Sequence, residues 1–215
     1  MKPMGLLRCL CLALALGGCL SLGDTPATRF YVLTPLTDRA EAPQSEAQSA
    51  EARTRVIVGL VPVEIPQYLD RPQIVTRISA NELGLAEFDQ WAEPLPESVT
   101  QVLAENLTRL VSTRGIDVLT DLRSNRGAYQ VGVTLMRFER DADNGVVLQA
   151  RWTLAEERDQ AVRVQNVFEV RIPLEAPGYD AIAGSMSRAL AALSRDIALH
   201  LRAVVRHGEA TRPGR

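Results

Sequence analysis

Three consecutive segments between residues 129 and 172 alternate apolar and polar residues, and this pattern constrains the fold more than any other feature of the chain. A period of two is typical of strands that have one buried and one solvated face. The parity of the alternation shifts near Met136, which predicts a β-bulge. Asn144-Gly145 is a strong signal for a tight hairpin turn, and a second turn is expected at 158–160. The region therefore predicts an antiparallel meander of three long strands.

Two segments with helical periodicity can cover the apolar face of this meander. Apolar residues recur every three or four positions between Pro96 and Gly115, which suit the first turn and the C′ position of a helix. A longer apolar stripe runs from Ala181 to about Val205. The expected fold class is α+β, with an antiparallel-rich mixed sheet and two helices packed on one face.

Shorter extended segments surround the first predicted helix. They span residues 30–33, 55–65, 74–78, 81–88 and 116–119. Pro62 lies inside the second of them and predicts an edge position or a bulge. Segment 37–54 is rich in Ala, Glu, Gln and Ser, and we expect a flexible loop there. This loop lies between two predicted strands, so we interpret it as an insertion within one domain.

The N-terminus has the order of features found in an export signal. A positively charged start is followed by an apolar core at 9–16, two glycines and Cys19. The pattern resembles the bacterial lipobox, in which the cysteine thiol receives a diacylglyceryl group before cleavage. We expect Cys19 to begin the mature chain and to hold it on a membrane through its acyl chains. A chance cysteine and a transmembrane helix are the alternatives, although stretch 9–22 is shorter than the ~20 residues that a span needs.

These signals divide the chain into four parts. They are a signal peptide at 1–18, a tether at 19–28, one domain at 29–206 that contains the 37–54 loop, and a polar tail at 207–215.

Composition argues against several classes of function. Cys9 and Cys11 would leave with the signal peptide and Cys19 would be acylated, so no thiol remains for a disulfide, a nucleophile or a metal site. His200 and His207 are the only imidazoles. Two basic residues also leave, so 22 of the 24 remain against 26 acidic residues, a net charge of −4. We therefore expect no enzyme activity, no cofactor, no metal and no nucleic-acid partner.

Two motifs rich in proline and aromatic residues indicate more than a scaffold. The first lies within 61–77 and contains Tyr68-Leu69-Asp70-Arg71, and the second is Trp91-Ala92-Glu93-Pro94-Leu95. With the early Tyr31-Val32-Leu33, they resemble the signature of the ABC-type transport auxiliary lipoprotein family, the PqiC-like proteins. The resemblance covers roughly residues 30–205.

This resemblance implies a membrane-anchored, non-enzymatic subunit of an envelope transport system. Relatives accompany an ABC ATPase, a permease and an MCE-domain protein that moves lipids between the inner and outer membranes. Leu20 follows Cys19, where many inner-membrane lipoproteins have Asp, and this favours the periplasmic face of the outer membrane. The sequence leaves the oligomeric state open, a homo-oligomer included.

The loop Tyr68, Leu69, Asp70 and Arg71 is our candidate for partner binding, with Trp91 as a second contact. Flanking prolines limit the freedom that the loop loses on binding, and Tyr and Arg are frequent interface anchors. Alternatively, Tyr68 and Leu69 pack on the core, Asp70 and Arg71 pair locally, and Trp91 braces the start of the helix. A second hypothesis for the function is a stand-alone lipoprotein that binds a small ligand or lipid between the sheet and the helices.

Overall fold

The computed structural model describes residues 26–37, 55–120 and 128–210. The predicted signal peptide, Cys19 and nearly all of the predicted 37–54 loop lie outside the described residues. The strands are β1 (Arg29–Tyr31), β2 (Val56–Leu60), β3 (Gln73–Arg77), β4 (Leu83–Trp91), β5 (Ile116–Leu119), β6 (Tyr129–Arg140), β7 (Gly145–Glu156) and β8 (Val162–Pro173). The helices are α3 (Leu95–Val111), a 3₁₀ turn at Ser112–Arg114, and α4 (Tyr179–Ala210).

Strands β6, β7 and β8 form the predicted antiparallel meander. The register of β6 against β7 shifts between Leu135 and Arg137, where the change in parity predicts a bulge. Asn144 takes a φ of 60° in the β6–β7 turn, a left-handed conformation that Asn tolerates better than most residues. The local pattern of the sequence therefore accounts for the three strands of this meander.

The free edge of β6 is shared by segments that are distant in sequence. Its first residues pair in parallel with β2, Thr134 bridges to Glu64, and Arg140 pairs with Thr76 of β3. The predicted strand 55–65 is thus interrupted: β2 ends at Leu60, the Val61 N–H still donates to the Val131 carbonyl, and pairing with β6 resumes at Glu64. Pro62 lies in this interruption, consistent with its missing N–H group.

The remaining strands extend the sheet on either side of these pairings. β5 adds in parallel to β2, β4 adds antiparallel to β3, and β1 adds in parallel to β4. β4 runs to Trp91, three residues beyond the predicted end at Phe88. The result is an open mixed sheet in which β1 and β8 lie at opposite ends of one path of neighbouring strands.

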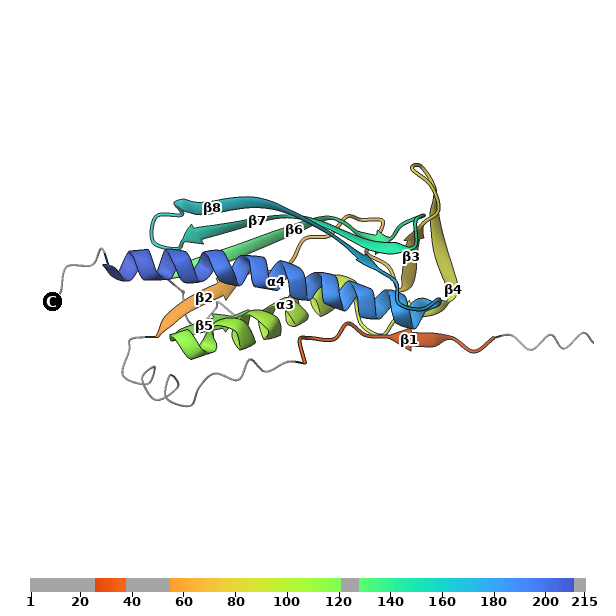
Figure 1. Cartoon of the computed structure of the whole chain (residues 1–215), viewed down its shortest axis with the longest axis horizontal. Helices are drawn as coiled ribbons and strands as arrows, with labels where there is room; N and C mark the ends of the chain where they lie inside the picture. Colours follow the sequence, from red (N-terminus) through yellow and green to blue (C-terminus); the bar gives the residue numbers. More distant parts are fainter. Residues whose placement is uncertain (1–25, 38–54, 121–127, 211–215) are drawn as a thin grey trace, which may run out of the picture.

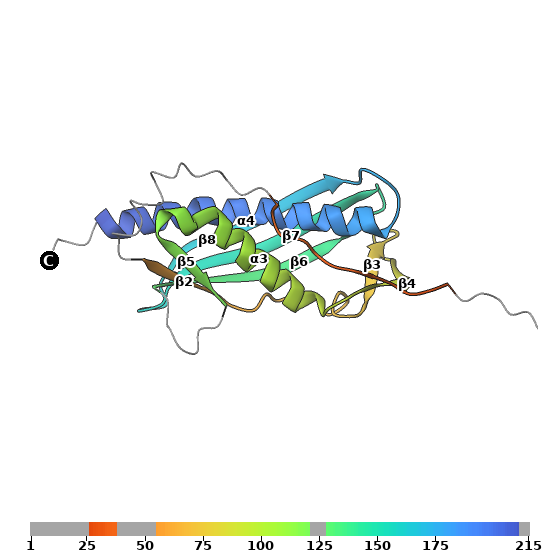
Figure 2. The same ribbon diagram turned by 90° about the horizontal axis from the view of Figure 1, so that it is seen from below.

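Both helices lie against the same face of the sheet (Figure 1, Figure 2). The predicted α+β class, with an antiparallel-rich mixed sheet and two helices on one face, is confirmed. α4 continues to Ala210, so it includes the start of the predicted polar tail. Asp196 on α4 accepts hydrogen bonds from the Trp152 indole at 2.9 Å and from Asn166 at 3.2 Å, which ties the helix to β7 and β8. Among the described helices, none is both long and apolar enough to cross a bilayer.

The segment after β1 crosses the junction between α3 and α4. Leu33 is buried, and the Thr34 N–H donates to Ser187 Oγ at 3.0 Å. The fully buried Asn106 accepts from the Leu36 N–H at 2.7 Å and donates to Ser194 Oγ at 3.2 Å. Since both helices hold this segment, β1 is fixed in position and its side chains have defined orientations.

Candidate functional site

The predicted partner-binding loop joins the β6 bridge at Glu64 to strand β3. Its turn is closed by the Leu69 N–H, which donates to the Pro66 carbonyl, and by the Arg71 N–H, which donates to the Leu69 carbonyl, both at 2.9 Å. The Trp91 N–H donates to the Pro72 carbonyl at 2.7 Å. The structure therefore brings together the two motifs that the sequence singled out.

Some side chains of this loop are buried and others are exposed. Leu69 belongs to the hydrophobic core, and Trp91 retains only 6% of its exposure. Tyr68 is half-buried against the core, whereas Asp70 is exposed. Leu69 is therefore packed on the core, as the alternative for this loop expects, and Trp91 is buried beneath the loop; Asp70 and part of Arg71 form the accessible surface. Partner binding by this loop stays a prediction.

Glu139 on β6 holds the loop in place through a hydrogen bond to Tyr68. Its side chain is fully buried, and Oε2 accepts the Tyr68 hydroxyl at 2.9 Å and the Phe138 N–H at 3.0 Å. Oε1 accepts Arg77 Nε at 2.8 Å and Arg137 Nε at 3.1 Å. A buried carboxylate is tolerated when its lone pairs are satisfied and its charge is balanced, and here four donors and two cations do so.

The electrostatics of this cluster keep Tyr68 protonated. Burial raises the pKa of Tyr68 to about 12, and the neighbouring Glu139 carboxylate adds to this effect. The hydrogen bond to Glu139 also raises the pKa of Arg77. Tyr68 is therefore a hydrogen-bond donor to Glu139 at every physiological pH.

Arg71 carries an incomplete set of contacts. Its Nε atom is buried and has no hydrogen-bond partner among the described residues. An unsatisfied buried donor costs about 1–3 kcal/mol. Asp70, the preceding residue, is exposed, so the surface of the loop offers a carboxylate, whereas the unpaired N–H of Arg71 is buried.

Sequence reasoning missed Glu139, although it holds the loop in place. One feature of the sequence indicates it in part: the β6 bulge shifts the alternation of apolar and polar residues and places a charged residue beside the fully buried Phe138. The two arginines that balance it come from β3 and β6, and only the pairing of these strands near Thr76 and Arg140 makes the cluster apparent. The cluster is therefore a product of tertiary structure.

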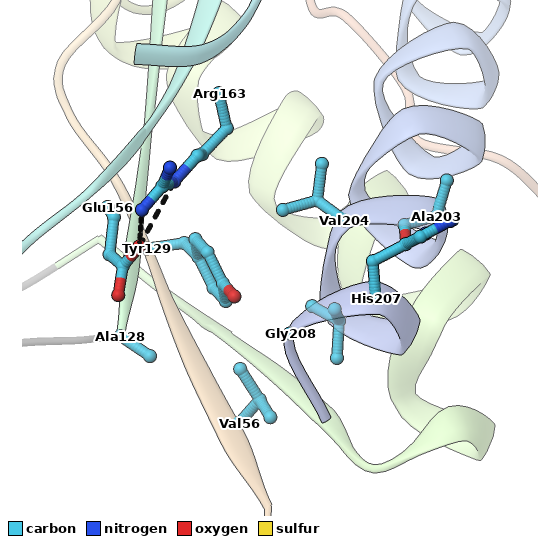
Figure 3. A pocket seen from close by; sticks show the side chains of 10 residues that line it. Val56, Ala128, Tyr129, Glu156, Arg163, Ala203, Val204, His207 and Gly208 are labelled. Carbon is cyan, nitrogen blue, oxygen red and sulfur yellow. Dashed lines mark hydrogen bonds and ion pairs between the residues drawn. The ribbon is translucent and has the colours of Figure 1, made fainter. Parts of the chain in front are cut away.

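A separate cavity lies beside the last turns of α4 (Figure 3), and the C-terminal end of α4 is at the end of the molecule opposite β1 (Figure 1). It has a volume of ≈ 530 Å³ and is lined by the ends of β2, β6, β7 and β8 and the last turns of α4. Glu156 and Arg163 form an ion pair on its wall. The Tyr129 hydroxyl points toward α4, and a Cβ on Gly208 would lie 2.7 Å from that oxygen (Figure 3). Glycine at 208 therefore permits this close approach.

Metal-ligating clusters of three or more His, Cys, Asp or Glu residues are absent from residues 26–37, 55–120 and 128–210. What the described residues form is an α+β domain with an open mixed sheet, a braced surface loop at one end and a small cavity at the other.

A family model places this domain among known proteins. The model of the ABC-type transport auxiliary lipoprotein component matches residues 36–198, so the chain belongs to that family. No functionally curated protein matches the sequence.

Solved structures share the fold. The crystal structure of an uncharacterised protein superposes with a TM-score of 0.67 at 20% identity, covering 82% of this chain and 99% of the other. A protein from Xanthomonas campestris superposes with a TM-score of 0.64 at 17% identity, covering 86% of this chain and 98% of the other. The domain thus spans nearly the full length of both.

Proposed function

We propose that the chain is a membrane-anchored lipoprotein subunit of an ABC/MCE-type envelope transport system, which moves lipids between the inner and outer membranes. Its role is structural, through binding of partners, and it is not an enzyme. The single observation that carries this proposal is the match to the ABC-type transport auxiliary lipoprotein family over residues 36–198. The partners are an MCE-domain protein and the permease and ATPase of the transporter.

The anchor of this proposal is Cys19, acylated by diacylglyceryl and palmitoyl groups. Two or more acyl chains hold a protein stably on a bilayer, whereas one chain binds marginally. Leu20 favours the periplasmic face of the outer membrane, as expected from the sequence. The segment after β1 is hydrogen-bonded to both α3 and α4. This supports the proposal, because a tether attached to that segment would hold the whole domain close to the membrane.

The loop Tyr68–Arg71 is the proposed contact with a partner. Glu139 holds Tyr68 in a fixed geometry, which lowers the ordering cost of binding. The exposed Asp70 and the partly exposed Arg71 support the proposal, because a partner can reach both charged side chains on the loop surface. Trp91 contributes through support of the loop and not through exposed surface.

Co-purification of loop variants from membranes tests this role. We expect Arg71→Ala and Asp70→Ala to reduce recovery of the transporter subunits at least fivefold, with unchanged melting temperature and membrane fractionation. Arg195→Ala is the matched control, since Arg195 is an exposed arginine on α4. Equal recovery of partners by Arg71→Ala, Asp70→Ala and Arg195→Ala would contradict the assignment of the loop.

The ≈ 530 Å³ cavity favours a second candidate function, a stand-alone lipoprotein that binds a small ligand or lipid. Cavities of this size accommodate small molecules. Its wall combines apolar side chains with the Tyr129 hydroxyl and the Glu156–Arg163 pair. Native mass spectrometry of the purified protein separates the two functions. A monomer with bound lipid and no protein partner favours the second.

A further inference from the structure

The most exposed large apolar side chain among the described residues belongs to β1. Phe30 is 64% exposed, and Val32, two positions on, is 56% exposed. Tyr31 between them points the other way, and its hydroxyl donates to Asp89 Oδ1 at 2.7 Å. Alternation along an extended chain therefore places Phe30 of this edge strand and Val32, the first residue after it, together on the outward side.

The exposure of Phe30 and Val32 is enforced by the structure on both sides of them. β1 pairs in parallel with β4, and the Ala92 N–H donates to the Tyr31 carbonyl at 2.9 Å. Arg29 pairs with the nearly buried Asp89 at 2.9 Å, and Leu33 is buried. The two apolar side chains cannot turn inward without breaking these contacts, so their contact with water is a fixed feature of the domain.

The proposed anchor lies within reach of this strand. Phe30 follows Cys19 by eleven positions. A fully extended chain of that length spans about 40 Å, and a flexible coil averages about 20 Å. β1 also lies at the end of the molecule opposite the end of α4 (Figure 1, Figure 2), so this end faces the membrane when the tether is short.

A lipid surface fits these two side chains better than a protein does. Stable protein interfaces need about 800 Å² from each partner, which two side chains do not supply. Insertion into a bilayer has no such minimum, and a short tether gives an effective concentration in the millimolar range.

We propose that Phe30 and Val32 insert into the interface of the bilayer that holds the acylated Cys19, and so orient the domain on that membrane. This inference rests on the lipid anchor of the proposed function. It adds a second, protein-borne contact that fixes which end of the domain approaches the lipid and leaves the rest of the surface open to partners.

Depth-dependent fluorescence quenching tests the contact. The acylated full-length protein is reconstituted in vesicles of phosphatidylethanolamine and phosphatidylglycerol with brominated acyl chains. The variants are Phe30→Trp and Val32→Trp, with Val167→Trp as the matched control, because Val167 is 61% exposed on β8 at the opposite end of the strand path. Native Trp91 and Trp152 are buried and contribute a constant background.

We expect bromolipid to remove at least half of the added emission of Phe30→Trp and Val32→Trp, and none of the emission added at Val167. Unquenched emission from both Phe30→Trp and Val32→Trp on vesicle-bound protein overturns the inference while the anchor stands. A blue shift without quenching also overturns it, since a partner or a second copy then covers the strand. Protein that does not float with vesicles overturns the anchor and the inference together.

Discussion

Replacement of Glu139 by Gln tests the buried cluster that holds the Tyr68 loop. Oε1 faces two arginines, and Oε2 faces the Tyr68 hydroxyl and the Phe138 N–H. Either orientation of a glutamine amide therefore puts an NH₂ group against two donors. Removing one partner of a buried ion pair costs about 3–5 kcal/mol. The side chains of Arg77 and Arg137 are 21% and 30% exposed, so water partly solvates their charges once the carboxylate is gone. We therefore expect Glu139→Gln to lower the free energy of unfolding by about 3 kcal/mol, at the low end of this range.

Urea unfolding followed by circular dichroism measures this cost, with thermal melting as a second readout. For a domain of this size, about 3 kcal/mol corresponds to a melting temperature lower by about 6–12 °C. Glu64→Gln is the control, because Glu64 is exposed on the same edge of β6 and contacts Thr134; we expect a change within about 0.5 kcal/mol. A loss below about 1 kcal/mol for Glu139→Gln would refute the reasoning.

Three further variants test other contacts. The pKa of Tyr68 is raised above 10, so its stabilising contribution is complete below pH 10 and is lost as the pH rises toward 12. Between pH 9 and 11.5, the free energy of unfolding in urea should fall by about 1 kcal/mol more for the wild type than for Tyr68→Phe, after a discount for the partial exposure of Tyr68. Parallel curves of unfolding free energy against pH for the two proteins would contradict this. Asn106→Ala leaves the Leu36 N–H and Ser194 Oγ without this partner, so the free energy of unfolding should fall by about 2–3 kcal/mol and hydrogen exchange at the Leu36 amide should accelerate. Unchanged exchange at Leu36 would contradict the attachment of this segment to α3. Asp196→Ala removes the acceptor of the Trp152 indole and should cost about 1.5–3 kcal/mol with a shifted emission maximum, whereas an unchanged spectrum would argue against that bond.

Sequence patterns predicted the parts of the fold that depend on neighbours along the chain. The meander, its bulge near Met136 and the turn at Asn144 follow from alternation and turn chemistry. The start of α3 near Pro96 and the left-handed Gly115 after it follow from helix-end preferences, although one 3₁₀ turn intervenes.

The pairings across the sheet were beyond local reasoning. The interruption after Leu60 and the sharing of one β6 edge by β2, Glu64 and β3 depend on contacts between distant residues. The buried Glu139 cluster depends on the same pairings. The position of Glu139 in the sequence of β6 therefore did not indicate which residues it contacts. The sequence singled out Tyr68 and Trp91, but only the structure shows that Trp91 is buried and that Tyr68 packs against the core.

The central claim is that this lipoprotein works as a membrane-held subunit of an ABC-type transporter. Its most direct test is affinity purification of the tagged full-length chain from detergent-solubilised membranes, beside Cys19→Ala, with identification of co-purified proteins by mass spectrometry. We predict that the wild-type chain is in the membrane fraction and recovers an ABC permease, its ATPase and an MCE-domain protein, and that Cys19→Ala leaves the membrane. Wild-type protein that recovers none of these subunits, or Cys19→Ala that stays firmly on the membrane, would contradict the account.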